Sequence, residues 1–226
     1  MNQNCNLFHM SLNSVFEQLR QFPVIPIVRT STTEMAATAI EWLIEAGLRT
    51  FEITMTIPGA VDLMTQYASR ENILVGAGTV TSEDQAKICL DAGARFIVSP
   101  GIFSQLPEIS HQRGAPCFLG ALTPTELHNA VRASADAVKI FPIKSMGGVT
   151  YLKALVSVFP GVPLVPTGGV NVDEISLYLK SGATCVGIGS ELVNEAMIRE
   201  GQRKKIIQLG QQVLQQTTEF SFTEST

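Results

Sequence analysis

The segment ADAVKIF, residues 135–141, shows the pattern from which the architecture of this chain follows. A short run rich in Val, Ile and Phe, without regular polar alternation, is typical of a parallel strand that is buried on both faces. Further runs of this kind are PVIPIV at 23–28, TFEIT at 50–54, ILVGA at 73–77, RFIVS at 95–99, PCFL at 116–119, PLVPT at 163–167 and TCVGI at 184–188. The sequence therefore predicts about eight buried parallel strands.

Amphipathic segments between these runs, such as 34–46 and 82–92, predict a helix after each strand. The strand–helix units repeat every 20 to 26 residues, roughly, which is the period of a TIM (β/α)₈ barrel. An open, doubly wound sheet shares this pattern, but the count reaches eight and no GxGxxG motif follows the first run. We therefore predict one α/β barrel domain over residues 1–226, with its core at about 23–198.

Both ends of the chain carry additional predicted features. Residues 12–19 predict an extra N-terminal helix that closes the bottom of the barrel, and residues at about 200–216 predict a final helix. The polar tail 217–226 is expected to fray.

Composition and charge exclude several classes of protein. The chain has 226 residues, with 16 Lys and Arg against 20 Asp and Glu, and a net charge of −4. The charges are interspersed, so the basic stripe of a nucleic-acid-binding protein is missing. No apolar run reaches the length of about 20 residues that a membrane span needs, and MNQNCNLFHM has no signal-peptide pattern. We expect a soluble cytoplasmic protein that binds neither nucleic acid nor membrane.

The residues that most often bind metals do not cluster in the sequence. The cysteines lack the paired spacing of zinc or redox sites, and Cys89, Cys117 and Cys185 lie in apolar runs, where a buried thiol is the commoner case. The histidines lie away from the predicted strand ends, and no Ser/His/Asp or Cys/His set is apparent. We expect neither a metal nor a cofactor.

Two charged residues, Lys139 and Glu52, lie inside apolar strands. Loss of hydration favours the neutral amine of Lys139, the form that attacks a ketone, and the protonated carboxyl of Glu52, which suits a general acid/base. The alternative is structural, with Glu52 paired to Lys139 or to Arg29. The two interpretations are compatible, and the presence of both residues favours Schiff-base chemistry.

Glycine-rich turns follow the last two strands, at 166–170 (PTGGV) and 187–190 (GIGS). Backbone N–H groups at such turns, with a short helix N-terminus behind them, form the phosphate site that many barrels carry there. Each turn taken alone is also compatible with an ordinary tight turn. Thr79, in GAGT, is placed to hold its hydroxyl over the pocket, and Arg29, in PIVRT, to hold a carboxylate through two hydrogen bonds.

The order TFEITMTIP, VGAGTVTS, FIVSPG, LTPTEL, VKIFP, VPTGGVN and VGIGS resembles the 2-keto-3-deoxy-6-phosphogluconate (KDPG) aldolase family. That family also covers 4-hydroxy-2-oxoglutarate (KHG) aldolase and the phosphogalactonate aldolases. The resemblance extends from about residue 23 to 192. It implies a class I aldolase, with pyruvate and a phosphorylated 2-keto acid as its small-molecule partners, no metal, no cofactor beyond the covalent Lys139 adduct, and a homotrimeric assembly.

The resemblance also implies roles for individual residues. Lys139 would form the Schiff base, Glu52 would shuttle protons, and Thr79 would contact the pyruvate carboxylate. The other implied binding residues are Arg29, Thr56, Pro100, Phe141, Thr167, Gly168, Gly169, Gly189 and Ser190, of which Gly168, Gly169 and Ser190 would hold the phosphate.

Two positions depart from the family pattern. Thr56 stands where one branch of the family has arginine, so that Arg29 is the candidate replacement, and Leu119 stands where proline often precedes the glycine of the fifth strand. Both leave the preferred sugar acid open between the gluconate and galactonate stereoisomers and KHG. A phosphosugar isomerase or synthase and a non-catalytic sensor of a phosphorylated metabolite also remain open.

Overall fold

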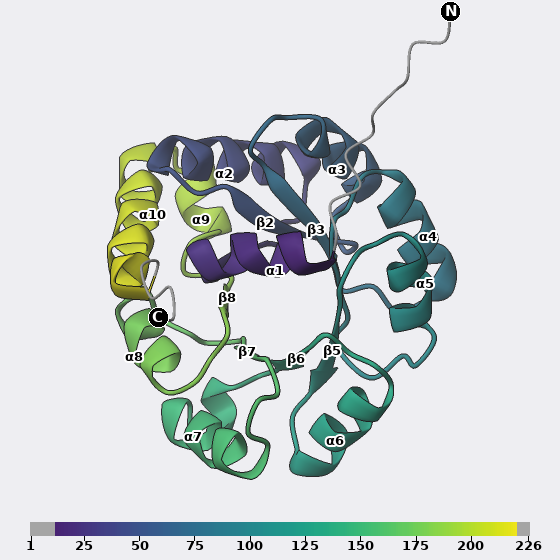
Figure 1. Cartoon of the computed structure of the whole chain (residues 1–226). Coiled ribbons are helices and arrows are strands. Elements are labelled where there is room, and N and C mark those ends of the chain that lie inside the picture. Colours follow the sequence, from purple (N-terminus) through teal and green to yellow (C-terminus); the bar gives the residue numbers. More distant parts are fainter. Residues whose placement is uncertain (1–11, 221–226) are drawn as a thin grey trace, which may run out of the picture.

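The computed structural model describes residues 12–220, in which eight parallel strands form a ring with helices around it (Figure 1). The strands are β1 (Val24–Val28), β2 (Thr50–Thr54), β3 (Leu74–Gly78), β4 (Ile97–Val98), β5 (Cys117–Ala121), β6 (Ala137–Ile140), β7 (Leu164–Pro166) and β8 (Val186–Ile188). The α-helices are α1 (Leu12–Gln21), α2 (Thr33–Ala46), α3 (Ala60–Ala68), α4 (Glu83–Asp91), α5 (Leu106–Gln112), α6 (Pro124–Arg132), α7 (Val149–Val158), α8 (Ile175–Lys180), α9 (Glu195–Arg199) and α10 (Arg203–Thr217). The 3₁₀ turns are η1 (Lys144–Met146), η2 (Val172–Glu174) and η3 (Thr218–Phe220).

The sheet closes on itself. Its strand order is β7-β6-β5-β4-β3-β2-β1-β8. At the seam Thr167 bridges Gly187, and the Thr184 N–H donates to the Leu164 carbonyl at 2.9 Å. The predicted TIM barrel is therefore confirmed, and the alternative of an open, doubly wound sheet is wrong.

Helix α1 lies across the amino-terminal end of the barrel, where Figure 1 shows it spanning the ring of strands. Its buried residues Val15 and Leu19, one helical turn apart, pack with interior side chains that include Ile25. The Phe16 ring lies 5.7 Å from the Phe118 ring, centroid to centroid. The predicted helix at the bottom of the barrel is confirmed.

The barrel interior is filled in layers, with bulky side chains at the bottom and glycines above them. The buried bottom layer beside α1 includes Ile25, Leu74, Phe96, Phe118, Val165 and Cys185. Above it, Gly76 on β3 is the register partner of Glu52, and Gly120 on β5 is the register partner of Lys139. These glycines have no room for a side chain, because a Cβ on Gly76 would lie 2.2 Å from the Phe96 ring and one on Gly120 would lie 2.3 Å from the Pro100 backbone.

Several element boundaries differ from those predicted. Strand β4 is assigned only two residues, although hydrogen bonds from the Arg95 N–H to Val75 and from the Ser99 N–H to Phe118 extend pairing over the predicted run. The last strand is followed by a short helix, α9, before α10 begins.

The C-terminal end of the described chain is more ordered than expected. Thr217 is buried and donates its hydroxyl hydrogen bond to the Leu214 carbonyl at 2.9 Å. Turn η3 then continues to Phe220, which packs against the core. Residues 217–220 of the predicted tail therefore belong to the end of α10 and to η3, and 221–226 lie outside the described residues.

Cys89, Cys117 and Cys185 are buried free thiols, as predicted. Burial raises the pKa of each to about 12, so they stay protonated near neutral pH and are poor nucleophiles. Within residues 12–220 no group of three or more His, Cys, Asp or Glu is arranged to hold a metal. None of the described helices is long and apolar enough to span a membrane. Cys5 and His9 lie outside the described residues.

The close approach of the Phe96 ring to Gly76 predicts that a side chain at position 76 destabilises the protein. Gly76→Ala is expected to lower the free energy of unfolding by about 1–3 kcal/mol, because the new methyl group overpacks the barrel interior. Urea unfolding measures this change. Gly101→Ala is the matched control, since its Cβ would lie 3.8 Å from the nearest atom, and we expect a change within about 0.5 kcal/mol. Equal stability of the two variants would show that the glycine layer is not tightly packed.

Candidate active site

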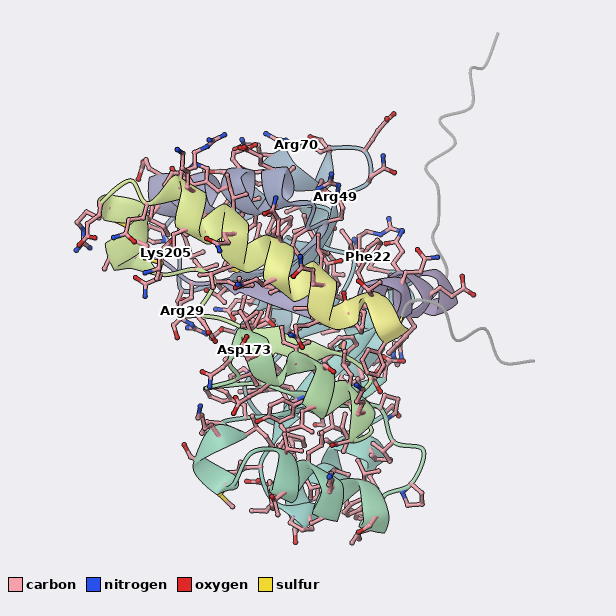
Figure 2. All side chains as sticks on the ribbon, turned by 90° about the vertical axis from the view of Figure 1, so that its left-hand side faces the viewer. Phe22, Arg29, Arg49, Arg70, Asp173 and Lys205 are labelled. Carbon is pink, nitrogen blue, oxygen red and sulfur yellow. The ribbon has the colours of Figure 1, made fainter. Side chains whose placement is uncertain are left out.

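A cavity of about 500 Å³ lies at the carboxyl ends of the strands. It is lined by Ile27, Arg29, Thr79, Pro100, Lys139, Phe141, Thr167, Gly168, Gly169, Val170, Asn171, Gly189, Ser190, Glu191 and Val193. Figure 2 shows Arg29 at the end of the barrel opposite α1. This is the end at which the reactive groups of a TIM barrel gather.

Lys139 and Glu52 form an ion pair inside the barrel. Lys139 comes from β6 and Glu52 from β2, and Lys139 Nζ donates to Glu52 Oε1 at 3.2 Å. The two residues are 5% and 2% exposed. Only Lys139 lines the cavity, so the amine faces the open space and the carboxylate lies behind it.

The surroundings of the pair hold both side chains in place. A Cβ on Gly78 would lie 2.2 Å from Glu52 Oε1, so glycine is needed at that position for the carboxylate to lie where it does. Lys139 Nζ lies 5.8 Å from the centroid of the Phe141 ring, which borders the cavity. An isolated buried charge costs several kcal/mol, roughly. Each of these two charges therefore needs the other as its partner inside the barrel.

Arg29, Thr56 and Thr79 form a second polar group at the cavity rim. Arg29 Nη1 donates to Thr56 Oγ1 at 3.2 Å, and Arg29 Nη2 donates to Thr79 Oγ1 at 2.8 Å. Thr56 also lies 2.8 Å, oxygen to oxygen, from Thr54. Thr79 has a φ of 58°, a left-handed conformation that β-branched residues rarely adopt. The guanidinium of Arg29 is thus held by the loops after β2 and β3.

The glycine-rich turns after β7 and β8 form a further part of the cavity wall. Gly168 and Gly169 have φ values of 91° and 79°, so both need glycine. A Cβ on Gly168 would lie 2.8 Å from the Phe141 ring. Behind Gly189 and Ser190 the chain makes a single turn, closed by hydrogen bonds to the Gly189 carbonyl, and α9 begins only at Glu195. The short helix that follows this turn is α9, and one turn of chain separates its first residue from Ser190.

The structure brings the predicted site residues to one place. All of them line the cavity except Glu52 and Thr56, which reach it through Lys139 and Arg29. The lining residues that the sequence reasoning missed are Ile27, Val170, Asn171, Glu191 and Val193. Strand alternation could have identified Ile27, because it lies two residues before Arg29 and such side chains share a face. Glu191 had only its position next to Ser190 as a signal.

Comparisons with known proteins agree with this geometry. Residues 15–209 match the family described as KDPG and KHG aldolase. The 2-dehydro-3-deoxy-phosphogluconate aldolase of Treponema pallidum is 32% identical over 203 residues, which cover 89% of this chain and 97% of that protein. The KHG/KDPG aldolase of Escherichia coli (strain K12) is 30% identical over 195 residues, which cover 85% of this chain and 91% of that protein.

A solved structure adds chemical detail to the similarity. It is the KDPG aldolase of Legionella pneumophila, with pyruvate captured as a covalent carbinolamine intermediate. It superposes with a TM-score of 0.79 at 31% identity and covers 91% of this chain and 99% of that one. On sequence, fold and the buried lysine at the cavity, the chain belongs to the KDPG and KHG aldolase family.

Proposed function

We propose that this protein is a class I aldolase that cleaves KDPG, a related 2-keto-3-deoxy sugar acid, or KHG to pyruvate and an aldehyde. The observation that carries the proposal is the buried amine of Lys139, held 3.2 Å from Glu52 at the wall of the cavity. An isomerase, a synthase without an imine step or a metabolite sensor needs no such amine. Membership in the aldolase family supports the same conclusion.

The reaction begins when Lys139 Nζ passes a proton to Glu52, and the free amine then attacks the C2 ketone. Glu52, directly or through water, moves protons so that the carbinolamine loses water and becomes an iminium. The C3–C4 bond then breaks, and its electron pair flows into the iminium to give an enamine. Glu52 or water takes the proton of the C4 hydroxyl, which becomes the carbonyl of the departing aldehyde. Protonation of the enamine at C3 and hydrolysis release pyruvate and the free amine.

The remaining lining residues hold the two ends of the substrate in this proposal. Arg29 and Thr79, already hydrogen-bonded to each other, bind the carboxylate next to the ketone. Pro100 and Phe141 border the reacting carbons, while the turns that carry Gly168, Gly169 and Ser190 face the distal end. Thr56 acts indirectly, by holding Arg29.

No cofactor is needed in this mechanism, because the iminium nitrogen itself accepts the electron pair. A single barrel domain, a cytoplasmic location and a homotrimeric assembly complete the proposal. The first two rest on the strand–helix pattern and the composition of the sequence, and the homotrimer rests on the resemblance to the family.

Trapping of the covalent intermediate tests the role of Lys139. Incubation with pyruvate and borohydride should reduce the iminium and leave one pyruvyl group on the chain, which mass spectrometry detects. Lys139→Ala should abolish the adduct and lower kcat by several orders of magnitude, roughly, because the nucleophile is gone. Lys153→Ala, an exposed lysine on α7, is the control and should label fully. An adduct that persists in Lys139→Ala would rule out the mechanism.

The proposed role of Glu52 as a proton carrier leads to a separate prediction. Glu52→Gln should lower kcat by about 10² to 10⁴, because the amide cannot carry protons, while saturating pyruvate should still give the adduct on Lys139. Steady-state cleavage rates and the trapping reaction measure the two effects. Glu41→Gln is the control, because Glu41 pairs with Arg70 at the surface. A kcat within a few-fold of wild type would show that Glu52 only holds the lysine in place.

A further inference from the structure

Glu191 places an acidic side chain at the wall where a phosphate group is expected. It follows Ser190 directly and lines the cavity next to the turns that carry Gly168 and Gly189. Its Oε2 accepts a hydrogen bond from the Val172 N–H at 2.9 Å, so the carboxylate spans from the loop after β8 to the loop after β7. A backbone N–H on this side of the cavity is thus already paired with an anion that belongs to the protein.

Among the described residues of the cavity wall, no cation is directed toward this side. Among the described lining residues, Arg29 and Lys139 carry the positive charges. Arg29 donates toward the loops after β2 and β3, and Lys139 donates across the barrel to Glu52 on β2. Both therefore serve the end of the substrate that carries the ketone and the carboxylate.

The charges just outside the cavity are also mainly negative. Asp173 and Glu174 lie in η2, directly after the β7 loop, and Figure 2 shows Asp173 at the same end of the barrel as Arg29. Lys144 lies nearby, with its stem against Gly169, but its Nζ is 3.8 Å from Glu174 Oε2. Burial raises the pKa of Glu191, and the charges of Asp173 and Glu174 raise it further, against the lowering effects of the Val172 N–H and Lys144.

We infer that Glu191 is a specificity-determining residue, which opposes a phosphate dianion at the distal end of the substrate and favours a 2-keto-3-deoxy acid that ends in a neutral hydroxyl. A carboxylate accepts a hydrogen bond from a hydroxyl, whereas it repels a phosphate in a partly desolvated cavity. The inference rests on the proposed aldolase function and narrows its substrate class. The shape of the glycine-rich turns fits many distal groups, and the charge of Glu191 beside the turns selects among these groups.

The test compares one 2-keto-3-deoxy acid with and without its distal phosphate. The quantity measured is the ratio of kcat/KM for the phosphorylated acid to that for the unphosphorylated acid, with pyruvate release coupled to lactate dehydrogenase. Glu191→Gln should raise this ratio about tenfold, mainly through the KM of the phosphorylated acid, because one charge is removed within several ångströms of the phosphate. Glutamine keeps an oxygen that accepts from Val172, so the loop contact survives.

Two further variants sharpen the test. Asp173→Asn removes a charge from the same end of the barrel without altering the cavity lining, and it should change the ratio by less than about twofold, because exposed charges are screened. Glu191→Ala removes both the charge and the loop contact and should raise the ratio in the same direction as glutamine.

The outcomes separate the inference from the proposed function. Unchanged ratios in both Glu191 variants, or an equal rise in Asp173→Asn, would overturn the inference, provided that pyruvate and borohydride still label Lys139. If pyruvate and borohydride leave no adduct on the wild-type protein, the proposed function and the inference are both wrong. A raised ratio with intact labelling supports both.

Discussion

The buried contact between Lys139 and Glu52 is the constraint on which the rest of this structure depends. Two charges taken out of water in the middle of a barrel do not add stability compared with apolar side chains of similar volume. Removal of one partner costs about 3–5 kcal/mol, because the other charge is left unpaired. The pair therefore restricts what the neighbouring strands can carry. In the proposed reaction the value of the pair is chemical, because it keeps one amine at the cavity wall next to a carboxyl group that can carry protons.

One glycine of the barrel interior, Gly78, follows directly from this constraint. Gly76 on β3 and Gly120 on β5 are the register partners of Glu52 and Lys139, and the Phe96 ring and the Pro100 backbone exclude side chains at these two positions. A side chain at Gly78 would overlap the carboxylate itself. The bulky layer below, with Phe96 and Phe118, seals the barrel toward α1. Bulk at the bottom and glycine above thus give the pair room without opening a channel through the protein.

Much of this arrangement could be predicted from the sequence, because strands buried on both faces leave a strong signal. The run 50–54 is β2 to the residue, and Glu52 and Lys139 could be recognised because they are charged residues inside apolar runs. Strand β4 agrees least well with its predicted run. Only two residues are assigned to the strand, although backbone hydrogen bonds to the neighbouring strands continue at Arg95 and Ser99. The motifs also identified both glycine-rich turns, since the left-handed conformation at Gly168 requires that residue type.

Loop geometry could not be predicted in this way. Alternation shows which face of a strand a side chain occupies, but it says nothing about the direction of a side chain after the strand ends. The hydrogen bonds of Arg29 to Thr56 and Thr79 depend on the paths of three separate loops. Glu191 is the clearest example, because its place in the cavity wall is set by a contact with Val172 on a different loop.

In the proposed reaction, the cavity joins two parts with different requirements. At the ketone end, cations and hydroxyls are supplied by β1, β3 and β6, and the chemistry fixes their identity because an amine, a carboxylate and an anion-binding group are all needed. At the distal end the walls are backbone turns, and their shape is set by glycine. A single side chain next to those turns changes the charge there without disturbing the reacting atoms. In this proposal, specificity can vary at Glu191 while the pair of Lys139 and Glu52 stays the same, because Glu191 is bonded to Val172, whereas Lys139 and Glu52 are bonded to each other.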